Sequence, residues 1–424
     1  MSLKIGLLGL GTVGAGTVKV LRENTDDITS RAGRPIEIVR AAVRDPALPR
    51  DCDLSGIELD SDADALVADP RIDVVVELMG GIGRARELVL AALANGKSVV
   101  TANKALIAEH GKEIFECAQA HGQVVAFEAA VAGGIPIIKA LREGLVGNRI
   151  DQIAGIINGT TNFILSRMEA DGADFAEVLA EAQAKGYAEA DPTFDVEGID
   201  AGHKLAILAT LAFDIPLATD QLHTIGVGKV SAEDISFARE LGYRIKHLAV
   251  ARRSEAGVEL RVEPTLVPKN AFVAKVDGVM NGVSISGNAV GTAGFYGPGA
   301  GALATASAVI ADIVDVALGH AIAPPAMAQE VSFVPQSAVV SAHYLRMRVT
   351  DQSGVMKTIS GILAGLDISI EAMVQKESSE GQAEVVLITH EVSTGAITQA
   401  MDELAACDAV HGGIVQMRLE HLSE

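Results

Sequence analysis

The chain has 424 residues, of which 49% are hydrophobic, and it contains no tryptophan. This length exceeds one compact core and predicts two or three domains, with interiors built from aliphatic residues as in parallel α/β sheets. The formal net charge of −21 argues against binding nucleic acid or an anionic membrane through overall charge. Three cysteines lie far apart, without metal or disulfide spacing, so a reducing, cytoplasmic location is expected.

The N-terminal stretch LKIGLLGLGTVGAGTVKVLREN predicts a strand, a glycine turn and an amphipathic helix. Gly9, Gly11 and Gly14 form a G-x-G-x-x-G motif between the strand and the helix. Such glycines permit a tight turn and the close approach of a pyrophosphate, which the helix N-terminus then faces. A glycine turn without a ligand is the alternative, but the placement after an N-terminal strand favours a dinucleotide. We assign Thr12 and Val13, within the motif, to the same site.

The second predicted strand, over residues 36–43, is followed by Arg44 and Asp45. An acidic side chain there accepts a hydrogen bond from a ribose 2′-hydroxyl, whereas an arginine binds the 2′-phosphate of NADP. Both types are present, so the sequence leaves NAD and NADP open. Arg44 comes first and favours NADP; the alternative is an arginine exposed on a loop.

Three further predicted strands, in IDVVVELMGG, KSVVTANK and QVVAFEAAVAGG, alternate with helical patterns. This alternation predicts a Rossmann-type, doubly wound parallel sheet, so the expected fold class is α/β. The strands end close to Thr101, Lys104 and Glu128. Ligands of open α/β sheets bind beyond the carboxyl ends of the strands, so we assign these three residues to the site.

A lysine faces an apolar stripe in the stretch DPTFDVEGIDAGHKLAILATLAF. Lys204 shares a helix face with Ile207, Leu208 and Leu211, and Asp200 precedes it by one turn. Burial of an ammonium group is unfavourable unless the group is paired. The pair is therefore either a structural ion pair or an acid that takes part in a reaction.

Acidic residues crowd the chain before this helix: Glu189, Asp191, Asp195 and Asp200. In a solvated loop they would form an acidic patch. Beside a buried lysine they predict a polar pocket that suits the ammonium group of a ligand and a reacting hydroxyl.

Six motifs resemble the homoserine dehydrogenase family, in its bacterial form with a C-terminal regulatory domain. They are GLGTVG, TANKALIA, FEAAVAGGIPII, NGTTNFIL, KGYAEADPTFDVEGIDAGHKLAILA and GPGAGALATASAVIADIVD. The resemblance is collinear over nearly the whole chain. It implies the interconversion of L-aspartate 4-semialdehyde and L-homoserine with NAD(P), on the route to threonine, methionine and isoleucine.

The resemblance also implies roles for single residues. Lys204 matches the lysine that gives a proton to the alkoxide, and Asp200 matches its partner. Glu189 matches the carboxylate that binds the substrate amino group, with Asp195 beside it, and Lys104 matches a lysine near the nicotinamide and the substrate.

The same comparison implies further ligand contacts outside these acidic residues. Gly186 and Gly301 match glycines at the cofactor, and Thr160 matches a residue at the substrate carboxylate. The family's sodium site corresponds to the carboxylate and backbone carbonyls of Glu128, Val131, Gly133 and Ile135.

The segment after Pro335 alternates as β-α-β-β-α-β and resembles an ACT domain, a module that commonly senses amino acids. Its first turn places Asp351, Gly354 and Val355 before a helix, where backbone amides would meet the carboxylate of an effector. We expect L-threonine as the effector, because homoserine is its precursor; a dimerisation module without a ligand is the alternative. A proline-containing linker precedes the segment, which predicts that it folds as a unit of its own.

The expected architecture has three domains. Residues 1–135 form the NAD(P)-binding Rossmann domain, completed by residues at about 300–325. Residues 136–325 form an α+β substrate-binding, catalytic and dimerisation domain, and residues 343–424 form the ACT domain. The uncharged stretch 278–311 is rich in glycine, asparagine and serine, so no membrane span is expected. We expect a homodimer or a homotetramer.

Two other classes of function are compatible with parts of the sequence. A non-catalytic amino-acid sensor built on an enzyme fold would explain the ligand motifs, but not the retention of both Lys204 and Asp200. An aldehyde dehydrogenase that forms an acyl-enzyme needs a nucleophilic cysteine, and neither Cys52 nor Cys117 has a catalytic signature.

Overall fold

The computed structural model describes residues 1–320, 325, 327, 331–377 and 381–422. The chain divides into two compact units. The first unit comprises Met1–Ile153, Asp200–Leu222 and Val279–Glu330, and the second comprises Ala154–Ile199, His223–Gly278 and Val331–Glu424.

A parallel sheet forms the centre of the first unit, with the strand order β3-β2-β1-β4-β5-β6. Its strands are β1 (Leu3–Leu8), β2 (Ile36–Ala42), β3 (Glu58–Asp60), β4 (Val74–Glu77), β5 (Ser98–Thr101) and β6 (Val125–Ala126). All residues of β4 and β5 are buried, as expected for parallel strands covered on both faces. The chain order reverses between β1 and β4, the place where such sheets bind ligands, so the predicted doubly wound sheet is confirmed.

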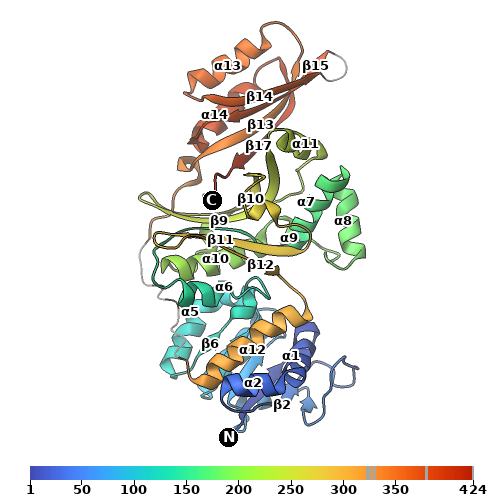
Figure 1. The fold of residues 1–424 in the computed structure, drawn as a ribbon, viewed down its shortest axis with the longest axis vertical. Helices are drawn as coiled ribbons and strands as arrows, with labels where there is room; N and C mark the ends of the chain where they lie inside the picture. Colours follow the sequence, from blue (N-terminus) through green and yellow to red (C-terminus); the bar gives the residue numbers. More distant parts are fainter. Residues whose placement is uncertain (321–324, 326, 328–330, 378–380, 423–424) are drawn as a thin grey trace. The chain divides into compact units, whose positions relative to one another are not determined.

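Helices cover this sheet, and they include one from much later in the chain. They are α1 (Thr12–Glu23), α2 (Thr25–Ala32), α3 (Ala63–Ala68), α4 (Gly83–Ala94), α5 (Lys104–Ala120) and α12 (Ala302–Leu318). α12 packs beside α1, where a Cβ atom on Gly16 would lie 2.6 Å from the carbonyl oxygen of Ala302 (Figure 1). Val309 and Ile313 complete the hydrophobic core of the sheet with Val18. Residues 302–318 are therefore part of the first unit.

The remaining elements of the first unit include the short helix α6 (Ile137–Lys139), most of α10 (Ile199–Phe213), and the antiparallel pair β11 (Met280–Gly287) and β12 (Gly291–Pro298). β7 (Ile150–Ile156) carries the chain from the first unit into the second.

The second unit begins with helices and a long antiparallel pair of strands. These elements are α7 (Gly159–Asp171), α8 (Phe175–Ala184), α9 (Thr193–Val196), β8 (His223–Thr224), α11 (Ala232–Glu240), β9 (Tyr243–Ser254) and β10 (Gly257–Pro268). β8 pairs in parallel with Arg261 and Val262 of β10.

The C-terminal segment follows the predicted β-α-β-β-α-β order of an ACT domain. It consists of β13 (Val340–Thr350), α13 (Val355–Gly365), β14 (Ile370–Glu377), β15 (Gln382–Thr389), the short β16 (Val392–Ser393), α14 (Thr394–Ala405) and β17 (Val410–Leu419). α13 and α14 pack next to each other, and their buried residues share a core with β13 and β15 (Figure 1).

This segment lies within the second compact unit, where it contacts the elements that precede it. The end of β17 pairs with β10, with Arg418 opposite Thr265 and Leu419 opposite Leu266. Tyr344 lies with Leu419 and Leu266 in one hydrophobic core together with residues of α7 and α11. Removal of the segment would therefore expose part of the core of the second unit.

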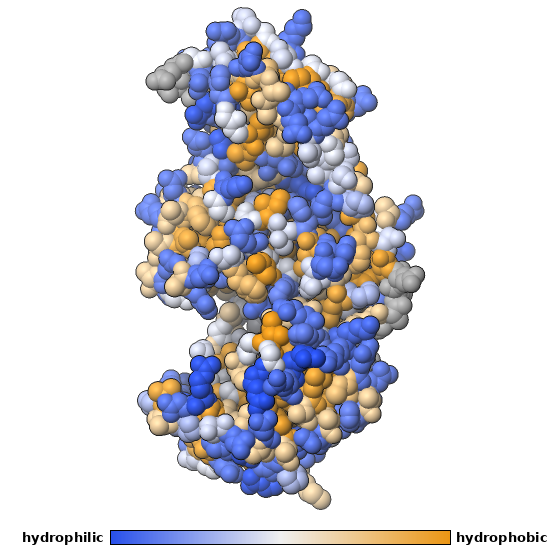
Figure 2. Space-filling view, turned by 180° about the vertical axis from the view of Figure 1, so that it is seen from behind, coloured by the Kyte–Doolittle hydropathy of each residue, from blue (hydrophilic) through white to orange (hydrophobic). Residues whose placement is uncertain are grey.

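The described part of the chain contains no helix that is both long and apolar enough to cross a membrane. Figure 2 shows many hydrophilic residues on the face that it presents, with hydrophobic residues among them.

Candidate functional site

The glycine turn between β1 and α1 has the geometry that close approach to a phosphate requires. Gly9 has a φ of 96°, and a Cβ atom there would lie 2.9 Å from the backbone of Leu78. A Cβ atom on Gly14 would lie 2.6 Å from the carbonyl oxygen of Gly9. Gly11 is the N-cap of α1 and makes no side-chain cap bond, and the first turn of the helix contains no acidic residue. The first amides of α1, at Thr12 and Val13, thus present a positive helix end to an anion.

Arg44 and Asp45 follow the second strand, as the sequence predicts, but their environments differ. Asp45 accepts a hydrogen bond from the amide of Ala47 at 2.9 Å, so its carboxylate is used in the turn. The guanidinium of Arg50 donates to the carbonyl oxygen of Asp45 at 2.7 Å. Arg44 is exposed to solvent. This arrangement leaves an arginine side chain accessible at the place where a 2′-phosphate would bind.

The end of β4 carries a buried carboxylate, Glu77, that the sequence analysis did not assign to the site. Its Oε1 accepts hydrogen bonds from the amides of Met79 and Gly80, both at 3.0 Å. Its Oε2 accepts a hydrogen bond from the hydroxyl of Thr101 at 2.7 Å. Burial raises the pKa of Glu77. A carboxylate at the end of the apolar run VVVE, directly before LMGG, was the signal in the sequence that marked this residue.

Asp200 joins two lysines at the start of α10. The Nζ atom of Lys204 lies 2.6 Å from Asp200 Oδ2, and that of Lys104, at the start of α5, lies 3.0 Å from Oδ1. The side chain of Lys204 is 13% exposed and that of Asp200 is 6% exposed, so the pair is largely buried but still reaches the surface. Two ammonium groups around one carboxylate leave a net positive charge, which favours an oxyanion nearby.

His203, next to Lys204 in the chain, lies in the same electrostatic environment. Burial lowers the pKa of His203, and Glu109 and Asp200 oppose this effect. The neutral imidazole therefore adds no further positive charge to the lysine cluster near neutral pH.

The second unit carries the predicted substrate residues other than Lys104. Asp195 accepts a hydrogen bond from Asn158 Nδ2 at 2.8 Å, and Asn158 Oδ1 also caps α7 through the amide of Thr161 at 2.9 Å. Thr160, buried at the start of α7, donates its hydroxyl proton to the carbonyl oxygen of Tyr187 at 2.7 Å. Asn158 is therefore a further residue of this site, which the sequence analysis did not assign.

The other predicted contacts of this region lie on exposed chain or in turns. Glu189 is exposed after α8, and Gly186 has a φ of 72° in the turn that ends that helix. Gly301, in the first unit, is the N-cap of α12 with a φ of 120°. The structure thus groups Lys104, Asp200 and Lys204 in the first unit, and Thr160, Gly186, Glu189 and Asp195 in the second.

The predicted sodium loop is buried and has an unusual backbone. Glu128 accepts hydrogen bonds from the amides of Ile138 and Lys139 at 2.9 and 2.8 Å, and burial raises its pKa to about 6. Val131, Gly133 and Ile135 are buried, and Gly133 has a φ of 49° next to the backbone of Gly299. Among the described residues no group of three or more His, Cys, Asp or Glu side chains has an arrangement for a metal ion. A cation here would depend mainly on backbone carbonyls, which are hard ligands that suit a monovalent ion.

The predicted effector turn precedes α13. Gly354 is the N-cap of this helix, with a φ of 98° and no side-chain cap, and Val355 is its first residue. The amide of Asp351 donates to the carbonyl oxygen of Gly381 at 2.8 Å. The amide of Val355 donates to the carbonyl oxygen of Gln352 at 3.3 Å, and no side chain caps the start of the helix.

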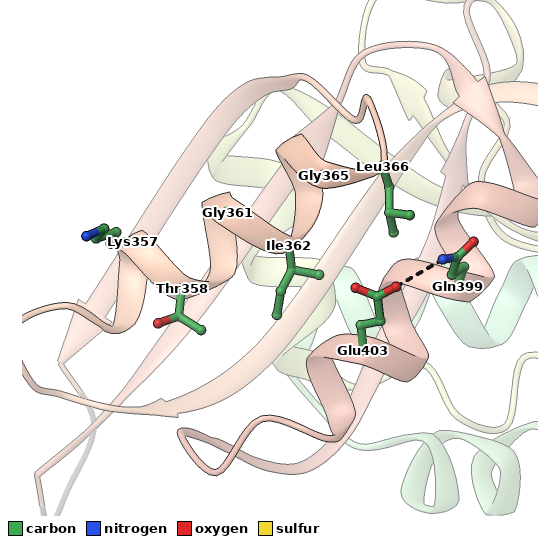
Figure 3. A pocket seen from close by; sticks show the side chains of 8 residues that line it. All are labelled: Lys357, Thr358, Gly361, Ile362, Gly365, Leu366, Gln399 and Glu403. Atoms are coloured by element: carbon green, nitrogen blue, oxygen red, sulfur yellow. Dashed lines mark hydrogen bonds between the residues drawn. The ribbon is translucent and has the colours of Figure 1, made fainter.

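A groove of about 710 Å³ lies between α13 and α14 and does not include the effector turn (Figure 3). It is lined by Lys357, Thr358, Gly361, Ile362, Gly365, Leu366, Gln399 and Glu403. Gln399 Nε2 donates to Glu403 Oε1 at 3.0 Å across one turn of α14.

Comparisons with known proteins match all parts of the chain. Residues 9–128 match the family model described as homoserine dehydrogenase, NAD binding domain, residues 136–314 match homoserine dehydrogenase, and residues 343–409 match ACT domain. A homoserine dehydrogenase of Pseudomonas aeruginosa is 52% identical over 433 residues, which cover 99% of each chain.

Solved structures give the same similarity. The crystal structure of a homoserine dehydrogenase from Thiobacillus denitrificans has a TM-score of 0.93 and 52% identity, covering 99% of this chain and 98% of that one. A hyperthermophilic archaeal homoserine dehydrogenase in complex with NADPH has a TM-score of 0.63 and 28% identity, covering 75% of this chain and 98% of that one.

Proposed function

The chain belongs to the homoserine dehydrogenase family and is an oxidoreductase that acts on a CH–OH group, and on this premise we propose that Lys204 is its proton donor. When bound, the reduced nicotinamide would supply a hydride to the aldehyde carbon of aspartate 4-semialdehyde. The electron pair of the carbonyl bond moves to oxygen, and the ammonium group of Lys204 protonates the alkoxide to give homoserine. In the reverse direction the neutral amine of Lys204 accepts the hydroxyl proton.

The observation that carries this proposal is the pair of ion pairs at Asp200. One carboxylate holds Lys204 at 2.6 Å and Lys104 at 3.0 Å, so both ammonium groups have a fixed position. A fixed donor is already in place when negative charge develops on the substrate oxygen. The second lysine balances the charge of Asp200 after Lys204 has given up its proton.

We also propose that the acidic residues of the second unit bind the amino group of the substrate. Glu189 and Asp195 supply carboxylates for the ammonium group, and the hydrogen bond from Asn158 fixes the orientation of Asp195. Thr160 is assigned to the substrate carboxylate. Its hydroxyl group already donates to the carbonyl oxygen of Tyr187. The substrate carboxylate would therefore be bound by the backbone amides at the start of α7.

For the cofactor we propose NADP, held by the glycine turn and by Arg44. The exposed guanidinium supports this assignment, and the archaeal relative is a complex with NADPH. We assign the remaining cofactor contacts to Thr101, Gly186 and Gly301.

We propose three further features that the family resemblance implies. The buried loop from Glu128 to Ile135 binds a sodium ion, whose charge would offset that of the buried carboxylate. The ACT domain binds L-threonine at Asp351, Gly354 and Val355 and reduces the activity. The enzyme works in the cytoplasm as a homodimer or homotetramer, in threonine, methionine and isoleucine biosynthesis.

An Asp200→Asn variant tests the role of the lysine cluster. The amide keeps the size of the side chain but cannot hold two ammonium groups by charge, so we expect kcat for homoserine oxidation to fall by about 10- to 100-fold. Steady-state assays with NADP and with NAD measure the loss of kcat and the cofactor preference. The same assays with added threonine measure its inhibition of the enzyme. A variant with the kcat of the native enzyme would show that the ion pairs are only structural.

A further inference from the structure

Glu77 is a buried carboxylate that takes no part in the proposed chemistry. Its side chain is fully buried at the end of β4, whose other residues are all valines. Among the described residues no basic side chain forms an ion pair with it, and its partners are neutral donors: the amides of Met79 and Gly80, the hydroxyl of Thr101 and the side chain of Asn103. A carboxyl group in such a place is unfavourable for stability compared with an aliphatic side chain. Its contacts therefore indicate a role other than stabilising the fold.

The hydrogen bonds of Glu77 continue toward the start of α5. Thr101 Oγ1, which donates to Glu77, accepts a hydrogen bond from the amide of Asn103 at 3.0 Å. Asn103 Nδ2 donates to the carbonyl oxygen of Gly81 at 2.6 Å, and Asn103 Oδ1 caps α5 through the amide of Leu106 at 3.1 Å.

These bonds connect two segments that Glu77 holds at once. One is the glycine turn after β4, where Gly80 and Gly81 have φ values of 70° and 73°. The other is the end of β5 with the start of α5, whose first residue is Lys104. Lys104 then reaches Asp200 at 3.0 Å.

We propose that Glu77 is a positioning residue that holds Lys104 against Asp200. Its two carboxylate oxygens fix the glycine turn and the hydroxyl of Thr101, and Asn103 connects both to the first turn of α5. This inference rests on the proposed role of Lys104 and Asp200 in the active site.

The test is a double-mutant cycle of Glu77→Gln and Lys104→Met. In Glu77→Gln one oxygen still accepts from the amides, but the new NH₂ group donates toward Thr101 Oγ1, whose own proton then loses its acceptor. We expect kcat/KM for homoserine to fall about tenfold, a change typical of one misplaced hydrogen-bonded group. In the Lys104→Met background the same change should have no further effect, because the group that it positions is gone.

Ser98→Ala is the matched control, since Ser98 is a buried hydroxyl at the opposite end of β5 and bonds to Gln123. It should change the melting temperature but not kcat/KM. If Glu77→Gln does not fold, Asn103→Asp replaces it in the cycle, because it keeps the cap of α5 and loses the donor to Gly81. Losses that multiply in the double variant, or a Glu77→Gln variant with native kcat/KM, would overturn the inference. A Lys104→Met variant with native kcat/KM would instead contradict the proposed role of Lys104.

Discussion

Asp200 is the residue on which the proposed chemistry depends most, because it is shared by two lysines from different helices. The stripe of Lys204, Ile207 and Leu208 is a local pattern, so its burial beside Asp200 could be predicted from spacing alone. The ion pair of Lys104 with Asp200 could not be predicted in this way, because the start of α5 and the start of α10 meet only in the folded chain. The same reason applies in part to Glu77 and Asn158, because Thr101 and Asp195, one partner of each, come from distant parts of the chain.

Arg44 is the residue at which cofactor choice can be tested. If its guanidinium binds the 2′-phosphate, Arg44→Ala removes a charge-assisted contact that only NADP makes, so the KM for NADP should rise about tenfold or more while that for NAD changes little. Steady-state kinetics with both cofactors measures this difference. Equal changes in the two KM values would remove Arg44 from the site.

At the scale of elements, the strands and helices of the first unit follow from local periodicity. Continuous apolar runs and the glycine motif predict parallel strands, and the observed order agrees with the predicted doubly wound sheet. The ACT pattern is also present in the C-terminal segment. Its place within the second unit has a tertiary cause, the pairing of the last residues of β17 with β10.

Buried ion pairs strengthen this joint between β10 and the C-terminal end of the chain. Arg261, with 1% of its side chain exposed, pairs with Glu259 at 2.7 Å, with Glu263 at 2.9 Å and with Glu420. Arg418 pairs with Glu263 at 2.9 Å. Charges that are removed from water in this way are unfavourable when one partner is lost.

Glu420→Gln should therefore destabilise the protein strongly. We expect the free energy of unfolding to fall by about 3–5 kcal/mol, because Arg261 loses a charged partner inside the protein. The control is Lys376→Ala, which breaks an ion pair with Glu240 in which both side chains are 47% exposed. Such a pair contributes about 1 kcal/mol or less. Denaturant unfolding followed by circular dichroism compares the two, and similar losses would contradict the account of the joint.

At the scale of the whole molecule, the residues proposed for catalysis are spread over both units. The ammonium donors lie in the first unit and the carboxylates for the substrate amino group lie in the second, with Asp195 and Asp200 on one continuous stretch of chain. Their chemical types and order in the sequence indicated a polar pocket. The substrate itself came from the family resemblance, because no single spacing of residues specifies homoserine.

The most direct test of the central claim is the kcat of Lys204→Ala for aldehyde reduction, measured together with the dissociation constant for NADPH by fluorescence. General acid catalysis typically contributes about 10²–10⁴-fold, so kcat should fall within this range while cofactor affinity is unchanged. Lys112→Ala, which changes an exposed lysine on α5, should keep the native values. A Lys204→Ala enzyme that binds NADPH and retains nearly native kcat would contradict the assignment of Lys204 as the proton donor.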